Sequence, residues 1–184
     1  MHNRMFLIFF WFVINYSIVT FGKSSNLNIE SDQMYQLLIG KKTNKAQLWT
    51  LEEGSKKSTL IKTYKHAFGR VSGDKVKKGD LRTPEGIYFP VRHINTTNLS
   101  QRKYSDIAVE LNYPNPFDRM EKKTGYGIWL HGAGNDKRIA KKQVTEGCVA
   151  FYNKDMLQLS QAILPNNSII NIAEDLGSIN DEKK

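Results

Sequence analysis

The sequence predicts a single, mostly β domain that carries one or two short helices. β-Prone stretches recur along the chain, and glycine, proline, asparagine and serine separate them. Residues 154–164 alone repeat apolar side chains at the spacing of a longer helix. The length of 184 residues fits one domain, and 40% hydrophobic with 24% charged residues is typical of a globular chain. The single cysteine excludes an internal disulfide framework.

The expected strands are short and rich in β-branched and aromatic residues. In chain order they are residues 34–39, 45–51, 58–64, 86–91, 107–111, 127–131, 149–152 and 168–173. Residues 40–44 (GKKTN) separate the first two strands and favour a hairpin. Residues 52–55 form the next turn, and the polar, glycine-bearing residues 70–84 are expected to form a long loop. Pro90 has no amide hydrogen, so it places the end of its strand at a sheet edge or a bulge.

Two segments are expected to be helical. A turn at residues 113–116 (YPNP) leads into a short helix over residues 117–123. Asn153 is a favourable N-cap for a second helix over residues 154–164, because its side-chain oxygen can accept a backbone amide hydrogen. This second helix has one apolar face and ends at residues 165–167 (PNN).

The N-terminal segment has the layout of a secretory signal peptide. A short, weakly positive start precedes the unbroken apolar run 5–14 (MFLIFFWFVI), and small residues follow that run. We therefore expect residues 1–22 to be a cleaved signal peptide, although the apolar length also fits an uncleaved membrane anchor. Residues 23–33 are then a short linker, residues 34–175 the folded domain, and residues 176–184 a flexible tail.

The net charge of +9 indicates a basic surface. An exported protein rarely meets nucleic acid, and the chain has no basic stripe interleaved with aromatic residues, so we expect no nucleic-acid partner. The charge fits either an anionic envelope or wall surface, or a plain solvated surface. We expect a monomer of the periplasm or cell envelope, which touches a membrane only if its N-terminal segment stays attached.

Cys148 and His131 are the pair of residues best suited to nucleophilic chemistry. Cys148 lies in residues 145–149 (TEGCV), just before an expected strand, and His131 ends another strand beside glycines. A cysteine attacks as its thiolate, and histidine, with an ordinary pKa of about 6.5, is the natural base. Gly147 would let the backbone approach a substrate carbonyl, and the amides of Gly147 and Cys148 would be free to stabilise an oxyanion. The alternative is a buried structural cysteine and a structural histidine.

These residues resemble the signature of the L,D-transpeptidase catalytic (YkuD) domain. That signature places Ser/Thr-His-Gly-Cys and an apolar residue after a His-Gly pair and a spacer. Residues 145–149 match it at four of five positions, and residues 125–132 (GYGIWLHG) resemble the strand that delivers the histidine. Residues 79–88 (GDLRTPEGIY) resemble a strand entry of the family, and residues 153–155 (NKD) the asparagine and aspartate that follow the cysteine. The resemblance covers residues 34–173.

Two positions depart from the family pattern. Glu146 stands where the family has a histidine, and Ala150 stands where it has an arginine two residues after the cysteine. We expect position 146 to act through its backbone, so that Glu146 need not abolish catalysis. The absence of the arginine puts the substrate contacts of the cross-linking enzymes in doubt. The chain therefore looks more like a side branch that includes L,D-carboxypeptidases and enzymes that detach proteins from the wall.

The resemblance implies an L,D-transpeptidase-like β-sandwich and a two-step acyl transfer on peptidoglycan stem peptides. Cys148 would attack the carbonyl before the terminal D-residue of a tetrapeptide stem, with His131 as the base and a thioester as the intermediate. The backbone around Gly147, helped by the Thr145 hydroxyl, would hold the oxyanion. An amine acceptor would make the protein a transpeptidase, and water would make it a carboxypeptidase. A catalytically inactive domain that binds wall peptides is the third hypothesis.

Four further residues are candidate substrate contacts: Tyr126, Gly132, Arg138 and Lys141. Arg138 and Lys141 lie in the basic loop between the two catalytic candidates. This loop either captures stem-peptide carboxylates or is simply solvated. Tyr126, like Trp129, either lines the cleft or packs in the core.

We expect neither a metal ion nor a cofactor. His66 and His93 have no partners at metal-ligand spacing. His131, Glu146 and Cys148 could together hold a catalytic metal, but the use that the family makes of the Gly-Cys backbone disfavours this arrangement. The chain has no glycine-rich phosphate loop.

Overall fold

The computed structural model describes residues 33–51, 58–101 and 103–176. The expected signal peptide over residues 1–22 lies outside the described residues, as do nearly all of the linker and of the tail and the turn at residues 52–55. Among the described residues, no helix is long and apolar enough to cross a membrane.

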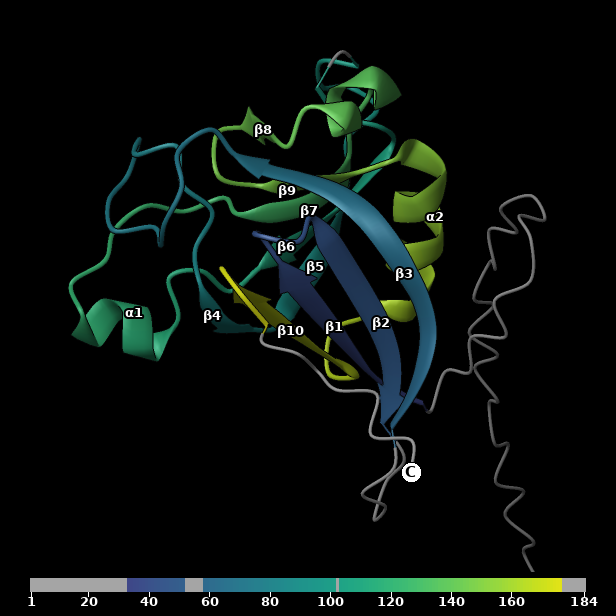
Figure 1. The fold of residues 1–184 in the computed structure, drawn as a ribbon, viewed down its shortest axis with the longest axis horizontal. Coiled ribbons are helices and arrows are strands. Elements are labelled where there is room, and N and C mark those ends of the chain that lie inside the picture. The colour runs from purple at the N-terminus through teal and green to yellow at the C-terminus, as the bar shows by residue number, and fades with distance from the viewer. Residues whose placement is uncertain (1–32, 52–57, 102, 177–184) are drawn as a thin grey trace, which may run out of the picture.

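Strands dominate the described chain, as predicted (Figure 1). In order they are β1 (Met34–Gly40), β2 (Lys45–Leu51), β3 (Ser58–Gly69), β4 (Gly86–Tyr88), β5 (Pro90–Asn95), β6 (Ile107–Leu111), β7 (Trp129–Gly132), β8 (Gln143–Thr145), β9 (Val149–Phe151) and β10 (Ser168–Ala173). Their lateral order is β4-β10-β1-β2-β3-β9-β7-β6-β5, and β8 pairs with β3. The expected hairpin of β1 and β2 is present, and β10 lies parallel to β1 on its other side.

Strand β3 joins two halves of the sheet. Its first part pairs with β2, whereas His66 and Ala67 pair with β9, and its last two residues pair with β8. Figure 1 shows β3 as the long, curved strand that runs across the molecule. One apolar core contains side chains from both halves, such as Leu37 and Leu48 from the first and Leu130 from the second. The single, mostly β domain that the sequence predicts is therefore confirmed, with its core between two layers.

The helices are short. They are α1 (Pro116–Met120), the 3₁₀ helix η1 (Asp136–Ala140) and α2 (Asn153–Ala162). Helix α1 has a capping box, in which Asn115 accepts the amide hydrogen of Asp118 and the Asp118 carboxylate accepts that of Asn115. Helix α2 buries Met156 and Leu159 in the core.

Asn153 does not cap α2, so that prediction is wrong. The N-cap position belongs to Tyr152, which makes no side-chain capping bond. The Asn153 side chain instead accepts the Gly134 amide hydrogen at 3.0 Å and donates to the Gly134 carbonyl at 2.8 Å. It therefore ties the loop after β7 to the start of α2, a long-range contact that a local capping rule does not include.

Several boundaries also differ from the prediction. Strand β3 continues past residue 64 to Gly69, because its second part finds new partners in β9 and β8. The expected strand over residues 86–91 divides into β4 and β5, which belong to opposite ends of the strand order. Helix α1 begins and ends earlier than the predicted 117–123. Strand β8 and helix η1 were not predicted, because their short polar sequences have no clear period.

A buried lysine holds the long loop over residues 70–85 against the sheet. Lys41 is fully buried, and its Nζ donates to the Gly73 carbonyl and to Glu85 Oε1, at 2.8 and 2.7 Å. The Asp74 carboxylate accepts the Glu85 amide hydrogen at 2.7 Å, which closes the two ends of the loop. A buried cation that lost these partners would be costly, so the loop is well anchored.

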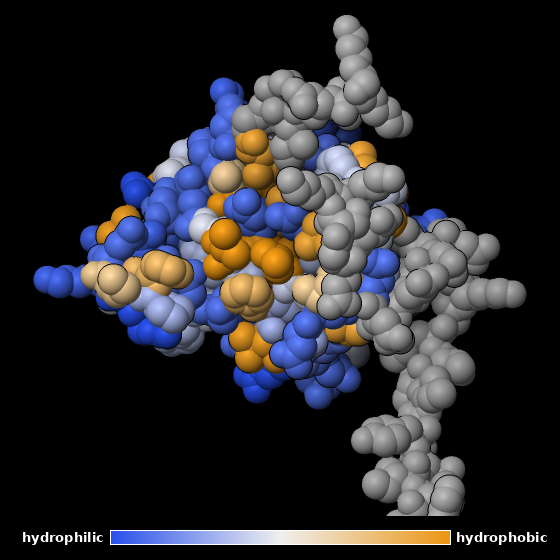
Figure 2. Space-filling view, turned by 90° about the horizontal axis from the view of Figure 1, so that it is seen from below, coloured by the Kyte–Doolittle hydropathy of each residue, from blue (hydrophilic) through white to orange (hydrophobic). Residues whose placement is uncertain are grey.

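Apolar side chains gather on the face that Figure 2 views from below. Among the exposed large apolar residues, Ile87, Phe89 and Phe117 line a groove of about 570 Å³ beside β4 and α1. Neither Cys148 nor His131 lines this groove. The groove is thus separate from the site described below.

Candidate active site

Two neighbouring parallel strands bring Cys148 and His131 to one place. Leu130 of β7 pairs with Val149 of β9, and His131 pairs with Ala150. Since side chains alternate along a strand, Cys148 and Ala150 point to the same side, which is also the side of His131. Cys148 and His131 both line a small hollow of about 40 Å³, called the first hollow here.

The turn before Cys148 is held in a conformation that requires glycine. Gly147 has a φ of 133°, and a Cβ there would lie 2.8 Å from the Arg82 carbonyl oxygen. The Thr145 hydroxyl donates to the Cys148 carbonyl at 2.6 Å and accepts the Gly147 amide hydrogen at 3.2 Å. Thr145 and the Gly147 amide are therefore engaged within the turn, which fixes the direction of the Cys148 side chain.

Thr83 links this turn to strand β3, a role that no sequence pattern predicts. Its buried hydroxyl accepts the Gly69 amide hydrogen at 2.9 Å and lies 3.5 Å from the Cys148 carbonyl oxygen. The anchored loop over residues 70–85 thus supports the cysteine turn from behind.

His131 presents one ring nitrogen to the site. Its Nδ1 lies 2.8 Å from the Gly132 carbonyl oxygen, which can only accept, so Nδ1 carries the hydrogen and Nε2 has the free lone pair. Only 2% of the residue is exposed. Burial lowers the pKa of His131 to about 4, although the bond to Gly132 acts in the opposite direction. The imidazole is therefore neutral at pH 7 and able to accept a proton.

Cys148 is a half-buried thiol in the resting site. Its Sγ lies 3.5 Å from the Gly127 carbonyl oxygen, to which the thiol can donate. Burial raises the pKa of Cys148 to about 11, and the negative charge of Glu146 adds to this rise, while the Trp129 amide opposes it. The two reactive groups thus meet as a neutral thiol and a neutral imidazole, with no preformed ion pair.

Tyr104 is a site residue that sequence reasoning missed. Its ring centroid lies 4.8 Å from that of His131, with the ring planes 58° apart. It also lines both the first hollow and a second one. Tyr104 comes from the connection between β5 and β6, where no motif marks it, and only the fold places it beside the histidine.

The second hollow shares Tyr104, Glu146 and Cys148 with the first and has a volume of about 270 Å³. Its lining residues are Lys75, Lys78, Gly79, Leu81, Tyr104, Gly125, Tyr126, Gly127, Ile128, Glu146 and Cys148. The Tyr126 side chain is 72% exposed, so it lines this cleft and is not a core residue. Lys78 Nζ lies 4.9 Å from the centre of its ring. The two hollows thus adjoin at Cys148 and together make one cleft beside the thiol.

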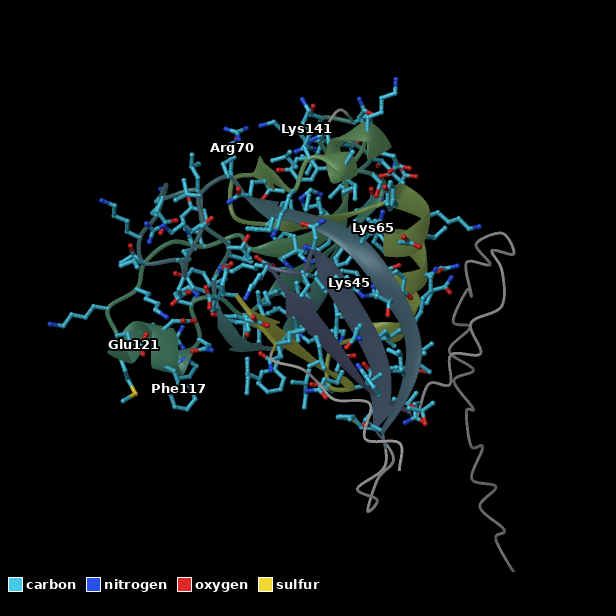
Figure 3. All side chains as sticks on the ribbon, in the orientation of Figure 1. Lys45, Lys65, Arg70, Phe117, Glu121 and Lys141 are labelled. Carbon is cyan, nitrogen blue, oxygen red and sulfur yellow. The ribbon has the colours of Figure 1, made fainter. Side chains whose placement is uncertain are left out.

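The other expected substrate contacts have different positions. Arg138 lines the first hollow, but its guanidinium donates to the carbonyls of Lys103 and Ala133, each at 2.9 Å. Gly132 packs closely under Ser105, whose Oγ would lie 2.0 Å from a Cβ at that position. Lys141 lines neither hollow, although Figure 3 shows it projecting from the same end of the molecule as Arg70.

The described residues contain no cluster of His, Cys, Asp or Glu that could hold a metal ion. His66 is fully buried, with its Nε2 3.2 Å from the Gly40 carbonyl oxygen. His93 Nε2 lies 2.8 Å from the Ile163 carbonyl oxygen. Both histidines therefore have structural partners.

The sequence matches the family model of the L,D-transpeptidase catalytic domain, YkuD, over residues 36–172. The chain belongs to this family. The matched range runs from β1 to β10, and it includes both hollows and the cysteine turn. The resemblance noted in the sequence motifs is therefore confirmed, and the chain carries an enzyme domain of this family.

Related proteins agree with this assignment. The provisionally named L,D-transpeptidase YafK of Escherichia coli (strain K12) is 29% identical over 91 residues, which are 50% of this chain and 32% of YafK. The solved structure of Bd1075 from Bdellovibrio bacteriovorus is 29% identical with a TM-score of 0.64, covering 77% of this chain and 48% of that one. The helical cell shape determining protein Pgp2 of Campylobacter jejuni is 27% identical with a TM-score of 0.65, covering 80% of this chain and 50% of that one. The chain thus spans about a third of the curated relative and half or less of these solved ones.

Proposed function

We propose that this protein is an exported, peptidoglycan-modifying L,D-transpeptidase that acts on tetrapeptide stems. The observation that carries the proposal is the meeting of Cys148 and His131 in one hollow, where β7 pairs with the start of β9. The base thus comes from strand β7, the nucleophile directly precedes strand β9, and the Gly147 turn fixes the direction of the thiol.

The first half-reaction forms a thioester on Cys148. The sulfur attacks the carbonyl carbon that precedes the terminal D-residue, and His131 Nε2 takes the thiol proton. Because burial keeps the thiol and the imidazole neutral, the proton leaves as the S–C bond forms rather than beforehand. The Cys148 amide, next to the fixed Gly147 turn, is the proposed donor to the oxyanion.

The thioester is complete once the first product leaves, and the second half-reaction then transfers the acyl group. His131, now protonated, gives its proton to the leaving amine of the D-residue as the C–N bond breaks. An acceptor amine then attacks the thioester and loses its proton to His131; the new amide forms as the Cys148 sulfur leaves, and His131 returns the proton to that sulfur. If water attacks instead, the product is a shortened stem with a free carboxylate.

The L,D-carboxypeptidase reaction is the second candidate. It is favoured by the likeness to Pgp2, a protein named for determining helical cell shape, and by Ala150, which stands opposite His131. Alanine at this position cannot itself bind an acceptor's carboxylate, as an arginine would. Trimming of stems and joining of stems share every step up to the thioester.

Export and location follow from the proposed substrate. Peptidoglycan stem peptides lie outside the cytoplasmic membrane, and the sequence of residues 1–22 fits a signal peptide or an anchor. We propose a monomer of the periplasm or cell envelope whose partners are these stem peptides.

Product analysis tests the proposal. The purified protein and its Cys148→Ala variant are incubated with tetrapeptide muropeptides, with and without a D-amino acid, and products are identified by mass spectrometry. Exchange of the terminal D-residue or new cross-links would support transpeptidation, and tripeptides alone would support the carboxypeptidase. Absence of any Cys148-dependent product would contradict both reactions and leave the wall-peptide-binding domain. Glu146→His is expected to keep turnover.

A further inference from the structure

Glu146 lies at the rim of the site and is shared by both hollows. Its Oε1 is 3.4 Å from Lys103 Nζ and 3.9 Å from Arg70 Nη2. The three side chains come from separate parts of the chain, and each is half or more exposed. A single carboxylate oxygen therefore bridges two cations at the entrance to the cleft of Cys148.

We propose that Arg70 and Lys103 form a carboxylate-binding subsite and that Glu146 occupies it until a ligand carboxylate takes its place. The inference rests on the proposed function for its substrate class, an acyl donor with a free carboxylate near the scissile carbonyl. Glu146 would then be a specificity-determining residue that selects for ligands able to displace it.

The strength of the contacts fits an exchangeable bridge. Ion pairs between exposed side chains are weak, because water and salt screen them. The distance of 3.9 Å to Arg70 is also too long for the two-pronged bond that a guanidinium makes with a well-placed carboxylate. A ligand carboxylate that contacts both Arg70 and Lys103 directly can therefore replace Glu146 at small cost.

The remaining cation of the first hollow is already engaged. The guanidinium of Arg138 donates to the carbonyl groups of Lys103, Ala133 and Val144, so it serves mainly to hold the loop after β7. Lys103 and Arg70, in contrast, reach the solvent. Figure 3 shows Arg70 projecting outward just beyond the end of β3, beside β8.

Alkylation of Cys148 measures this subsite without any turnover. Iodoacetate and iodoacetamide have nearly the same size and react in the same way: the thiolate attacks the methylene carbon, an S–C bond forms and iodide leaves. Only iodoacetate carries a carboxylate. Cys148 is the one cysteine in the sequence, so no other thiol competes. The ratio of the two rates cancels any change in the thiolate fraction.

The proposal predicts a higher ratio of iodoacetate to iodoacetamide rates in Glu146→Gln, by about two- to fivefold at low salt. Arg70→Gln and Lys103→Gln should each lower the ratio by a similar factor. Glu121→Gln is the matched control, because Glu121 is 64% exposed and pairs with Lys123 just after α1, away from Arg70 (Figure 3). Its ratio should equal that of the unchanged protein.

A double-variant cycle separates displacement from simple charge repulsion. If Glu146 acts by occupying the two cations, Glu146→Gln should have little effect in an Arg70→Gln, Lys103→Gln background. An equal effect in both backgrounds, or no effect in either, would overturn the proposal. The alkylation rates do not depend on turnover. An active enzyme with an additive cycle would therefore refute only the subsite. A non-additive cycle in an inactive protein would support the subsite and contradict only the proposed function.

Discussion

At the scale of the residue, burial sets the chemistry of the reactive pair. The pKa of Cys148 is raised to about 11 and that of His131 is lowered to about 4, in each case chiefly because the charged form loses solvation. The thiol of Cys148 is therefore protonated in the resting site. Its proton moves to His131 only when the sulfur attacks the substrate. This arrangement protects the thiol from unwanted electrophiles between turnovers.

The raised pKa of Cys148 predicts how its alkylation depends on pH. The rate with iodoacetamide should rise about tenfold per pH unit from roughly pH 7 to pH 10, because the thiolate fraction rises in that proportion below the pKa. A peptide thiol with the ordinary pKa of about 8.5 should level off within this range and is the reference. A plateau of the protein's rate at or below about pH 9, as in the reference peptide, would contradict the raised pKa of Cys148.

At the scale of the element, the strands beside the reactive pair could be predicted from the sequence. The residues that hold the pair in place from other parts of the chain could not. The apolar run before His131 and the run after Cys148 are clear β patterns. Tyr104 and Thr83 lie in segments without a period, and they act through partners far away in the chain. Local patterns hold no information about such contacts, which depend on how the sheet closes.

Asn153 provides a test at this scale. Replacing it with alanine removes two hydrogen bonds to Gly134, so we expect a loss of about 1–3 kcal/mol in the free energy of unfolding. The loop after His131 should also loosen, and kcat should fall several-fold with a smaller change in KM. Denaturant unfolding and steady-state kinetics measure the two effects.

Asn135→Ala is the control for that loop. Asn135 caps η1 by accepting the Lys137 amide hydrogen at the surface, so its loss should cost about 1 kcal/mol and leave kcat nearly unchanged. Equal effects of both variants on kcat would show that Asn153 has no special role in positioning the histidine loop.

At the scale of the whole molecule, β3 unites two layers around one core, and the layer that contains β7 and β9 buries two histidines. His66 in β3 and His131 in β7 have pKa values lowered to about 4, mainly by burial. The sequence predicted the class and the strand-rich domain, since patterning alone determines them. It did not predict that β3 would serve both layers, because that depends on the pairing of strands distant in sequence.

The two buried histidines make the fold sensitive to acid. In the unfolded chain both histidines become protonated below about pH 6.5, whereas in the folded chain they stay neutral down to about pH 4. The free energy of unfolding should therefore fall as the pH is lowered from about 6.5 to about 4. Each histidine accounts for up to about 3 kcal/mol of this fall in the free energy of unfolding. In urea titrations, the free energy of unfolding of His66→Gln should therefore fall less steeply between these pH values, whatever the effect of the substitution at neutral pH. An unchanged slope would contradict the buried, neutral state of His66.

The measurement that tests the account most directly is the mass of the intact protein during reaction with a tetrapeptide stem. We predict a transient adduct equal in mass to the tripeptide acyl group, absent from Cys148→Ala and released by hydroxylamine, which cleaves thioesters. His131→Gln should form this adduct at least about a hundredfold more slowly. Turnover of the stem by a protein that never carries such an adduct, or an adduct that persists in Cys148→Ala, would contradict the proposed thioester mechanism.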